Sequence, residues 1–361
     1  MKIFVDTNIF YNDWFMRNAN FKYLFHFLNN EGHSLVVSDL VIQESENIRN
    51  RELSEALHEI RSGIKKAQKL NSNKLDYNED DLGVKSYDLL SIIKSRADNV
   101  EKIGYENISH SEVVSRALKN KKPFLDGEKG YRDTLIWLSF IDYLVNNNVN
   151  DDVVFITQNK SDFFKNKKDF ICFHPDLAAD IEEKGVKAKV VPFTSLFDFI
   201  NSRVDKDKHA IDHYKSEEVF EDFIESSSIS FLNEMSNFGL ANYLENSIFE
   251  NKVRDIIALR VEMLEGLEDS EVISTRSLGG HDIYVSYSYN LRRVFLEIDI
   301  PEIDYAMNKY ELDKIFYDIE INSGVATLEC LIRPYFEVSF IYNDKDEELK
   351  NFEVANLRIR R

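Results

Sequence analysis

The chain has few of the residues that build small stapled or irregular folds. Its 361 residues include two cysteines, Cys172 and Cys330, which lie far apart in sequence. Neither a disulfide scaffold nor a cysteine zinc site is therefore expected, and a reducing cytoplasm is the default location. Five prolines and twelve glycines are also few, whereas phenylalanine and tyrosine are plentiful. This composition favours a chain rich in regular helices and strands.

Long apolar runs are missing as well. No segment approaches the roughly 20 apolar residues that span a bilayer, and Asp6 interrupts the first residues before the core of a secretory signal could form. We therefore expect a cytoplasmic protein with no membrane partner. At this length, two domains are expected rather than one.

Positive charge is scarce, since the formal net charge is −19. Residues 1–200 carry 31 acidic and 27 basic side chains, a net of −4, whereas residues 201–361 carry 33 and 18, a net of −15. A phosphate backbone responds to the local field rather than to the whole-chain charge. The candidate nucleic-acid backbone contacts are Lys121, Lys122, Arg132, Lys160 and Lys165. The alternative for these residues is a solvated, lysine-rich surface.

Short apolar segments alternate with helical patterns through the first 203 residues. Residues 2–5, 34–37, 153–157 and 188–193 have the composition of buried parallel strands. The spacing of apolar residues predicts helices over 20–29, 39–70, 84–103 and 109–119, and a further helix from Asp133 onward. Such alternation predicts an α/β domain over residues 1–203, with a parallel sheet sandwiched by helices.

The character of the chain changes after residue 203. Residues 204–270 are expected to hold a polar linker and acidic helices, the helices over 216–266, and residues 271–361 to form a β-rich accessory domain. Period-two patterns predict strands over 282–289, 293–300, 315–322, 325–333, 335–342 and 352–359. Tyr284, Tyr287 and Tyr289 are expected to pack in its core rather than to stack on bases. The acidic C-terminal region is expected to bind a regulatory protein or to mediate homo-oligomers.

Four acidic residues follow or open elements of the predicted sheet. Asp6 follows the first strand, and Glu44 lies in the first turns of the helix predicted over 39–70. Asp133 opens a helix, and Asp162 follows the strand over 153–157. The ends of parallel strands gather at one edge of a sheet, so the four side chains can meet there. Close carboxylates raise one another's pKa unless a cation compensates them. Oxygen ligands of this kind suit Mg²⁺ or Mn²⁺.

Each of these acids alone is more simply explained as a helix cap or a surface charge, and their joint placement is what favours a metal site. Asn8, Thr157 and Asn159 are neutral polar residues at the same edge, suited to orient the carboxylates, a water or a substrate phosphate. Asp126 is a candidate fifth acid. Asp142 lies nine residues after Asp133 and should face solvent from the other side of the helix.

Four short motifs in order carry a resemblance to a known family. They are Asp6-Thr7-Asn8 after a strand, Glu44 after the second strand, GYRDTLIW at residues 130–137 and ITQNKSDF at residues 156–163. Over about residues 1–200 the chain resembles PIN-domain nucleases, in particular the larger prokaryotic PIN-like group with a long helical insertion, here roughly residues 45–120.

The resemblance implies that Asp6, Glu44, Asp133 and Asp162 are catalytic residues that bind one or two Mg²⁺ or Mn²⁺ ions. Asn8 and Thr157 would support them, and Asn159 stands at a position that is often an acid in the family. The implied activity is hydrolysis of phosphodiesters, usually in RNA.

Because an unrestrained ribonuclease endangers its own cell, the family's habits point to an endoribonuclease that acts as a toxin or antiviral defence effector. Two alternatives stay open: a DNA-directed nuclease of flap-like or single-strand type, and a non-catalytic regulatory or scaffold protein on the same fold. Haloacid dehalogenase-like phosphatases also place an aspartate after the first strand. They need a second aspartate two residues later, where this chain has Asn8.

Overall fold

The computed structural model describes residues 1–11, 13–71, 86–124, 129–167, 170–203 and 213–360. By their internal contacts the residues form two compact units, Met1–Arg17 with Phe21–Phe199 and Asn18–Asn20 with Ile200–Arg361. The predicted three-part division at residues 203 and 270 stays a prediction. None of the described helices combines the length and apolar character needed to cross a membrane.

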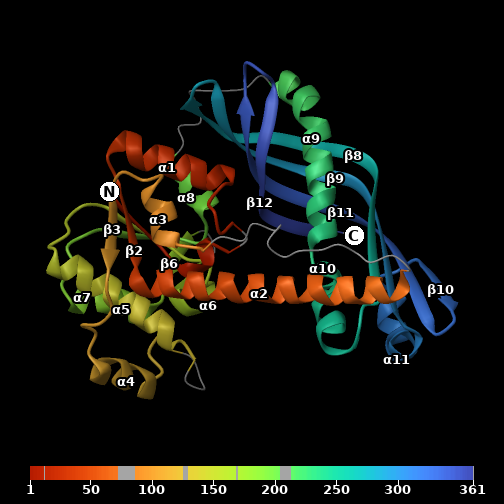
Figure 1. The fold of residues 1–361 in the computed structure, drawn as a ribbon, viewed down its shortest axis with the longest axis horizontal. Coiled ribbons are helices and arrows are strands. Elements are labelled where there is room, and N and C mark those ends of the chain that lie inside the picture. Colours follow the sequence, from red (N-terminus) through yellow and green to blue (C-terminus); the bar gives the residue numbers. More distant parts are fainter. Residues whose placement is uncertain (12, 72–85, 125–128, 168–169, 204–212, 361) are drawn as a thin grey trace. The chain divides into compact units, whose positions relative to one another are not determined.

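The first unit is built on a five-stranded parallel sheet with the strand order β3-β2-β1-β4-β7. Its strands are Lys2–Val5 (β1), Ser34–Ser38 (β2), Val100–Ile103 (β3), Val153–Ile156 (β4) and Val190–Phe193 (β7). The chain extends the sheet from β1 through β2 to β3, which lies beside β2 in Figure 1, and then starts β4 on the other side of β1. This reversal makes the carboxyl ends of β1 and β4 the switch point of the sheet, where open α/β folds form their ligand crevices.

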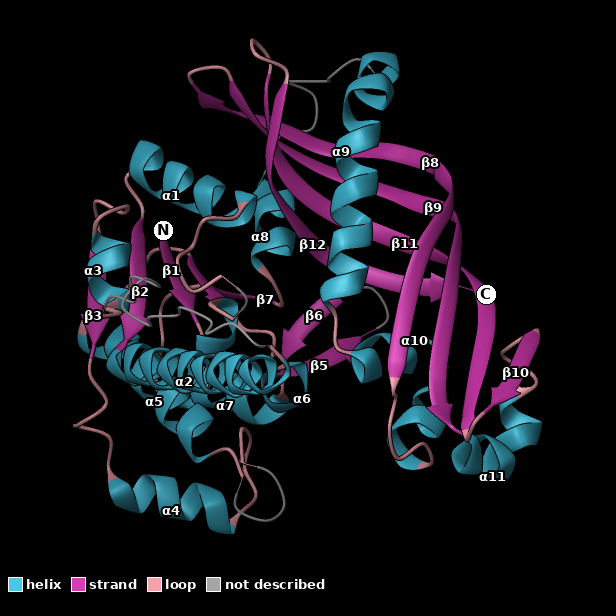
Figure 2. Ribbon diagram, turned by 45° about the vertical axis from the view of Figure 1, so that its right-hand side comes forward, coloured by secondary structure: helices cyan, strands magenta, loops and turns pink. Residues whose placement is uncertain are grey.

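Helices lie on both faces of this sheet, as Figure 2 shows. The helices of the unit are the 3-10 helix η1 (Thr7–Ile9) and the α-helices Ala19–Glu31 (α1), Asp39–Leu70 (α2), Leu89–Lys94 (α3), His110–Leu118 (α4), Tyr131–Asn146 (α5), Lys160–Phe163 (α6), Pro175–Glu183 (α7) and Leu196–Arg203 (α8). Phe164–Lys167 (β5) and Phe170–Phe173 (β6) form a small hairpin. Ser38 caps α2 by accepting a hydrogen bond from the Leu40 amide at 3.2 Å. The predicted α/β class is confirmed.

An aromatic cluster fixes α5 against the centre of the sheet. Phe4 of β1 and Phe155 of β4 lie side by side with ring centroids 5.0 Å apart, and Phe140 of α5 is 5.0 Å from each of them. Trp137 of α5 packs edge-on to Phe155, and its side chain is fully buried. Large buried aromatic residues dominate the energetics of such cores. The first turn of α5, with Asp133, is thereby held near the ends of β1 and β4.

The prediction of one helix over residues 84–103 is wrong. Helix α3 ends at Lys94, and Val100–Ile103 forms the edge strand β3, which pairs in parallel with β2. Two of these four residues, Glu101 and Lys102, are charged, so the segment lacks the apolar run typical of a buried strand. Part of the predicted loop over 71–83 and the start of the predicted helix lie outside the described residues.

The second unit is a long, curved antiparallel sheet with the strand order β10-β11-β9-β8, and β12 pairs with β11 beside β10. Its elements are the helices His213–Glu234 (α9), Asn237–Asn251 (α10) and Glu302–Leu312 (α11), and the strands Ala258–Gly279 (β8), Asp282–Pro301 (β9), Asp318–Asn322 (β10), Val325–Asn343 (β11) and Glu348–Arg360 (β12). Helix α9 crosses one face of the sheet (Figure 2). Phe220 of α9 packs there against Tyr287 and Phe340.

Two expectations for this region have clear outcomes. Tyr284, Tyr287 and Tyr289 are fully buried, which confirms their prediction as core residues. The prediction of helix up to residue 266 is wrong, because β8 begins at Ala258 and pairs with β9. The segment that begins β8 is rich in Leu, Met and Glu and so favours helix locally, but strand pairing overrides that preference. The predicted linker falls mostly on residues 204–212, outside the described residues.

The strands predicted separately over 325–333 and 335–342 form one strand, β11, and those over 282–289 and 293–300 form one strand, β9. Pro334 lies between the two predicted segments of β11, and it lacks the amide hydrogen that a regular strand pairing uses. The pairing of β11 with β9 shifts its register between Ile332 and Tyr335, and β11 continues through this irregularity. A bulge thus accommodates the proline without ending the strand.

Asp180 on α7 is a buried ionic centre of the first unit. It accepts hydrogen bonds from Arg116 of α4 at 2.5 Å, from Lys121 at 2.7 Å and from the Trp137 indole at 2.9 Å. Burial alone would raise the pKa of Asp180, but these donors and their charges lower it below its ordinary value. Arg116 is itself 5% exposed, so loss of Asp180 would leave a buried, uncompensated charge.

We expect Asp180→Asn to lower the free energy of unfolding by about 3 kcal/mol at pH 7. Because the folded-state pKa is lowered, this contribution is complete above the unfolded pKa of about 4 and disappears as the pH falls through the folded value. Urea unfolding at pH 7, 5, 4 and 3 should show the two proteins converging in acid. The control is Asp142→Asn on α5, whose carboxyl has a pKa raised by burial. Equal losses in both variants would contradict the role of Asp180.

Candidate active site

A pocket of about 360 Å³ opens at the switch point of the parallel sheet. Its lining comes from the loops after β1 and β4 and from the first turns of α2 and α5. The residues that line it are Asp6, Thr7, Asn8, Tyr11, Glu44, Arg132, Asp133, Gln158 and Asn159. Three of the four predicted acids therefore share one pocket, and Asp162 does not line it.

Asp6 is buried and held in one orientation by donors from two strand ends. Its Oδ1 accepts from the Thr7 amide at 2.7 Å, and its Oδ2 accepts from the Thr157 hydroxyl at 2.6 Å and the Asn8 side-chain amide at 2.9 Å. Burial raises the pKa of Asp6 to about 6, with a further rise from Glu44, while these three donors oppose the shift. The Asp6 carboxylate is thus held in place by neutral hydrogen-bond donors, and no cationic side chain of the described residues compensates its charge.

Asn8 and Thr157, for which a supporting role is predicted, join the ends of β1 and β4. Besides bonding Asp6, Asn8 donates to the Thr157 hydroxyl at 3.1 Å and accepts from the Gln158 amide at 2.9 Å. The Thr157 hydroxyl also accepts from the Asn159 amide at 3.1 Å. These bonds fix the two loops relative to each other, so the pocket keeps its shape.

Glu44 enters the pocket from α2 and is paired with a cation. One carboxylate oxygen forms an ion pair with Arg132, and the other accepts from the Thr7 hydroxyl at 2.9 Å. The Arg132 side chain is 64% exposed, whereas that of Glu44 is 12% exposed. A largely exposed arginine can exchange its partner, because such pairs contribute little stability.

Asp162 lies behind the pocket wall, in the short helix α6. It accepts from the Asn159 side-chain amide at 2.8 Å and from Ser161 at 3.2 Å, and Lys122 lies 3.5 Å away. Asn159, which lines the pocket, therefore connects Asp162 to it. Asp162 still acts on the site electrostatically, since it raises the pKa of Asp133.

Asp133 is the most strongly perturbed acid of the pocket. Burial raises its pKa to about 7, and the charges of Asp6, Asp162 and Glu44 add to the rise, while Arg132 opposes it. A carboxyl with this pKa is half protonated near neutral pH. Strongly perturbed pKa values of this kind gather at functional sites.

The chemistry of the donors fits a hard divalent cation, because the pocket offers carboxylate, hydroxyl and amide oxygens. The raised pKa values of Asp6 and Asp133 also mark a place that lacks positive charge. Within the described residues, however, no three acidic, histidine or cysteine side chains stand close enough together to hold an ion. Glu44 and Asp162 are instead engaged by Arg132 and Lys122. The predicted fifth acid, Asp126, lies outside the described residues.

The five predicted backbone contacts differ in their surroundings. Lys160 in α6 and Lys165 in β5 are exposed, and Arg132 is exposed at the pocket rim. Lys122 donates to the Ser161 carbonyl oxygen at 2.9 Å and faces Asp162. Lys121 is bound to Asp180 inside the unit, which leaves it less free to contact a ligand.

Three pocket residues were not among the predicted ones: Thr7, Tyr11 and Gln158. Thr7 and Gln158 directly follow Asp6 and Thr157, so their position in the same two loops was a usable signal. Tyr11 comes after η1 and its sequence context carries no such signal. Burial raises its pKa to about 12, helped by Glu44 and Asp6, so its phenol stays protonated at neutral pH and can donate a hydrogen bond.

Fold and site together define an α/β domain with an acid-lined crevice at the switch point of a parallel sheet. Residues 3–163 match the model of the PIN domain family, and all four predicted acids lie within that stretch. The first unit is therefore a PIN domain, which confirms the resemblance. PIN domains are generally nucleases and typically use divalent metals, so the first unit has the fold of a nuclease-type hydrolase. No curated protein and no solved structure matches the chain.

We expect Asp133→Asn to stabilise the metal-free protein. The folded-state pKa of Asp133 is raised to about 7, so ionising this carboxyl destabilises the folded protein. The destabilisation grows as the pH rises from about 4 to 7 and is complete above about pH 7. In chelator at pH 8 the melting temperature should rise by about 2–4 °C, for a gain of about 1 kcal/mol, and the gain should shrink towards zero at pH 4.

The matched comparison is Asp162→Asn, which removes a carboxylate already paired with Lys122 and should lower the melting temperature. Differential scanning calorimetry of both variants at pH 8 and pH 4 makes the comparison. A fall in the melting temperature of Asp133→Asn at pH 8 would contradict this account of the pocket.

Proposed function

We propose that the PIN domain is a divalent-metal-dependent phosphodiester hydrolase, an endoribonuclease that cuts within RNA. The observation that carries the proposal is the shared pocket of Asp6, Glu44 and Asp133 at the switch point, two of them with pKa values raised by burial and by their acidic neighbours. Mutual repulsion of this kind is an expected property of a cation site without its cation.

Asp6, Glu44 and Asp133 would hold a Mg²⁺ or Mn²⁺ ion, with Asp162 as a further acid behind Asn159. When bound, such an ion supplies a water of lowered pKa and stabilises charge on a phosphodiester oxygen. For the full ligand set, Glu44 and Asp162 have to leave Arg132 and Lys122.

The protein's own residues orient the site and the substrate. Hydrogen bonds from Thr7, Asn8 and Thr157 hold Asp6 in its orientation. The carboxylate therefore needs no rearrangement when a metal ion binds. Arg132, released from Glu44, is placed at the rim to contact a phosphate, and the protonated Tyr11 phenol can donate to a phosphate oxygen. Lys160 and Lys165 extend this positive rim and would position the backbone without reading sequence.

RNA as substrate, and a role as a toxin or antiviral defence effector in the cytoplasm, rest on the habits of the family. Cleavage of DNA is the alternative within the nuclease class. For the second unit, with most of the net negative charge, we propose binding of a regulatory protein or of a second copy of the chain rather than of RNA.

One observation favours a non-catalytic alternative. Arg132 and Lys122 already supply positive charge to Glu44 and Asp162, as substitutes for a metal would. In a regulatory or scaffold protein these ion pairs would persist at millimolar Mn²⁺. The two functions therefore differ in whether added cation changes the pocket.

The cleavage test uses the full chain with labelled single-stranded RNA and single-stranded DNA of the same sequence, in Mg²⁺, Mn²⁺ or chelator. We expect RNA cleavage with either ion and none in chelator. Asp6→Asn and Asp133→Asn should each lower the rate by at least about 100-fold. Asp142→Asn, on the same helix as Asp133 but half-buried away from the pocket, is the matched control and should keep full activity.

Three results would separate the alternatives. Cleavage of DNA alone would replace RNA by DNA as substrate. No cleavage of either strand, together with no Mn²⁺ uptake by calorimetry, would establish the non-catalytic reading. Equal cleavage by Asp133→Asn and the parent protein would remove the pocket from the reaction.

Arg132→Gln is expected to weaken RNA binding and to reduce the slope of log affinity against log salt concentration by about 1, because one phosphate contact is lost. Fluorescence anisotropy across a salt series, with Asp6→Asn in the background to prevent cleavage, measures both quantities. Arg51→Gln is the control, since Arg51 is equally exposed but faces Glu55 on the outside of α2. An unchanged slope in Arg132→Gln would contradict a phosphate contact.

A further inference from the structure

Three neighbouring strands of the second unit are irregular at the same level of the sheet. The pairing of β9 with β11 shifts between Ile332 and Tyr335, and the pairing of β8 with β9 shifts between Met263 and Glu265 and again between Glu268 and Glu271. At this level the outer partner of β11 also changes, since pairing with β10 ends at Glu329 and pairing with β12 begins at Arg333. Bulges are over-represented next to functional sites because they redirect side chains.

The irregularity changes which side chains reach the surface. Consecutive residues of a regular strand point to opposite faces, yet Arg292 and Arg293 are both exposed, and the flanking Leu291 and Val294 are fully buried. A hollow of about 430 Å³ lies here, lined by Glu265, Glu268, Arg292, Arg293, Leu331, Ile332 and Arg333. Its volume falls within the range of small-molecule sites, about 300–1,000 Å³.

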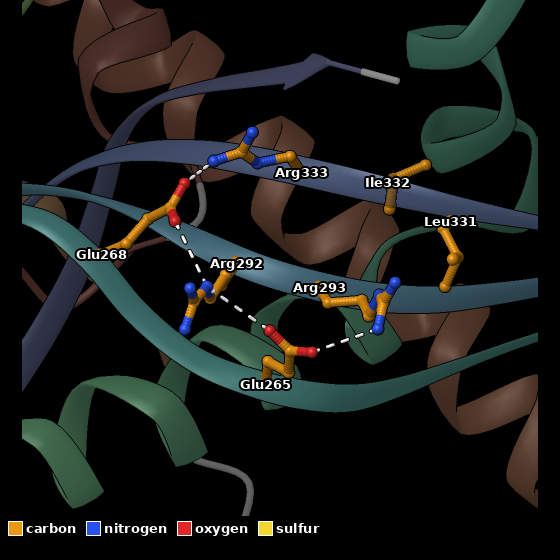
Figure 3. Close-up of a pocket in the computed structure, with 7 residues that line it drawn as sticks. All are labelled: Glu265, Glu268, Arg292, Arg293, Leu331, Ile332 and Arg333. Carbon is orange, nitrogen blue, oxygen red and sulfur yellow. Dashed lines mark hydrogen bonds and ion pairs between the residues drawn. The ribbon is translucent and has the colours of Figure 1, made fainter.

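The charged residues of the hollow form one alternating chain, which Figure 3 shows. Arg333 pairs with Glu268, and Arg292 lies 3.6 Å from Glu268 and 3.4 Å from Glu265. Arg293 completes the chain at 3.1 Å from the other oxygen of Glu265. Three guanidinium groups thus share two carboxylates, which leaves one positive charge in excess within a region of net charge −15.

The arginines are free to exchange partners. More than half of each of their side chains is exposed, so their pairs with the glutamates contribute little stability. A carboxylate ligand would carry the same single negative charge as the Glu265 or Glu268 side chain that it displaced from an arginine. A phosphomonoester carries up to two charges and three acceptor oxygens, which forked guanidinium groups bind in bidentate fashion. The excess positive charge and the three forks therefore select phosphate over carboxylate.

The hollow also has an apolar side. Leu331 of β11, which is half-buried, lines it (Figure 3), whereas the side chain of its neighbour Ile332 is fully buried in the core of the second unit. Inorganic phosphate would leave this side without a contact, whereas the base or sugar of a nucleotide could cover it. We propose that this hollow binds a nucleoside monophosphate, with its phosphate held by Arg292, Arg293 and Arg333 and its nucleoside against Leu331.

Isothermal titration of the full chain with AMP, GMP, CMP and UMP tests the proposal. Asp6→Asn is used as background, in chelator, so that metal-dependent binding in the PIN pocket contributes nothing. We expect saturable binding of at least one of these probes at one site per chain. The matching nucleoside should bind at least about tenfold more weakly because it lacks the charged contacts, and inorganic phosphate should also bind more weakly.

Single substitutions locate the site. Arg292→Ala and Arg293→Ala should each weaken binding at least about tenfold, and Arg293→Lys should weaken it less, which guards against loss through misfolding. Glu268→Gln should strengthen it, because a competing carboxylate is removed. The matched control is Arg260→Ala on β8, which removes an equally exposed arginine paired with Glu297 and Asp299 in the same sheet and should leave affinity unchanged.

The proposal is overturned if none of the four nucleotides binds. It is also overturned if Arg260→Ala weakens binding as much as Arg292→Ala does, if the nucleoside binds as tightly as its monophosphate, or if inorganic phosphate binds as tightly as the nucleotide. Because binding and not cleavage is measured, in a protein whose PIN pocket is inactivated, these outcomes are independent of the nuclease activity proposed above.

Discussion

Repulsion among carboxylates at the switch point is the constraint on which the first unit depends. Asp6 and Asp133 are kept mostly out of water, and the charges of neighbouring carboxylates, Glu44 for both and Asp6 for Asp133, add to the rise of their pKa values. A fold tolerates this cost only where the rest of the structure holds the groups in place. The aromatic packing of α5 on β1 and β4 and the hydrogen bonds of Asn8 and Thr157 do so here.

The arrangement of charges reaches beyond the acids themselves. Arg132 and Lys122 stand beside Glu44 and Asp162, and the side chain of Arg132 is 64% exposed whereas that of Lys122 is 19% exposed. They relieve part of the repulsion and can be displaced without disturbing the core. In the nuclease proposed above, a site built in this way would stay folded without a metal ion and would still accept one. The same two residues would then be released towards a phosphate.

Much of the fold and most of the pocket could be predicted from sequence, because the signals are local. The motif at Asp6, Thr7 and Asn8 directly follows a strand, and Ser38 caps a helix that begins where expected. The edge strand β3 could not be predicted, since two of its four residues are charged. The start of β8 was missed because its residues favour helix until β9 pairs with them.

Other features depend on contacts between distant residues, which no local pattern encodes. The partner of Lys121 is Asp180, 59 residues later, and nothing near either residue indicates the pair. The exposure of both Arg292 and Arg293 follows from bulges in three strands, which sequence periodicity hides. That Asp162 lies behind the pocket follows from its bond to Asn159.

The ionic centre at Asp180 has a consequence for how force is transmitted through the PIN domain. One carboxylate ties together α4, α7 and α5, through Arg116 and the indole of Trp137. Trp137 sits one turn beyond Asp133 on the same helix. A displacement of α4 by a bound molecule would therefore be transmitted through Asp180 to α5, the helix that carries Asp133. The inserted segment, roughly residues 45–120, is therefore connected to the pocket through α4, Asp180 and α5.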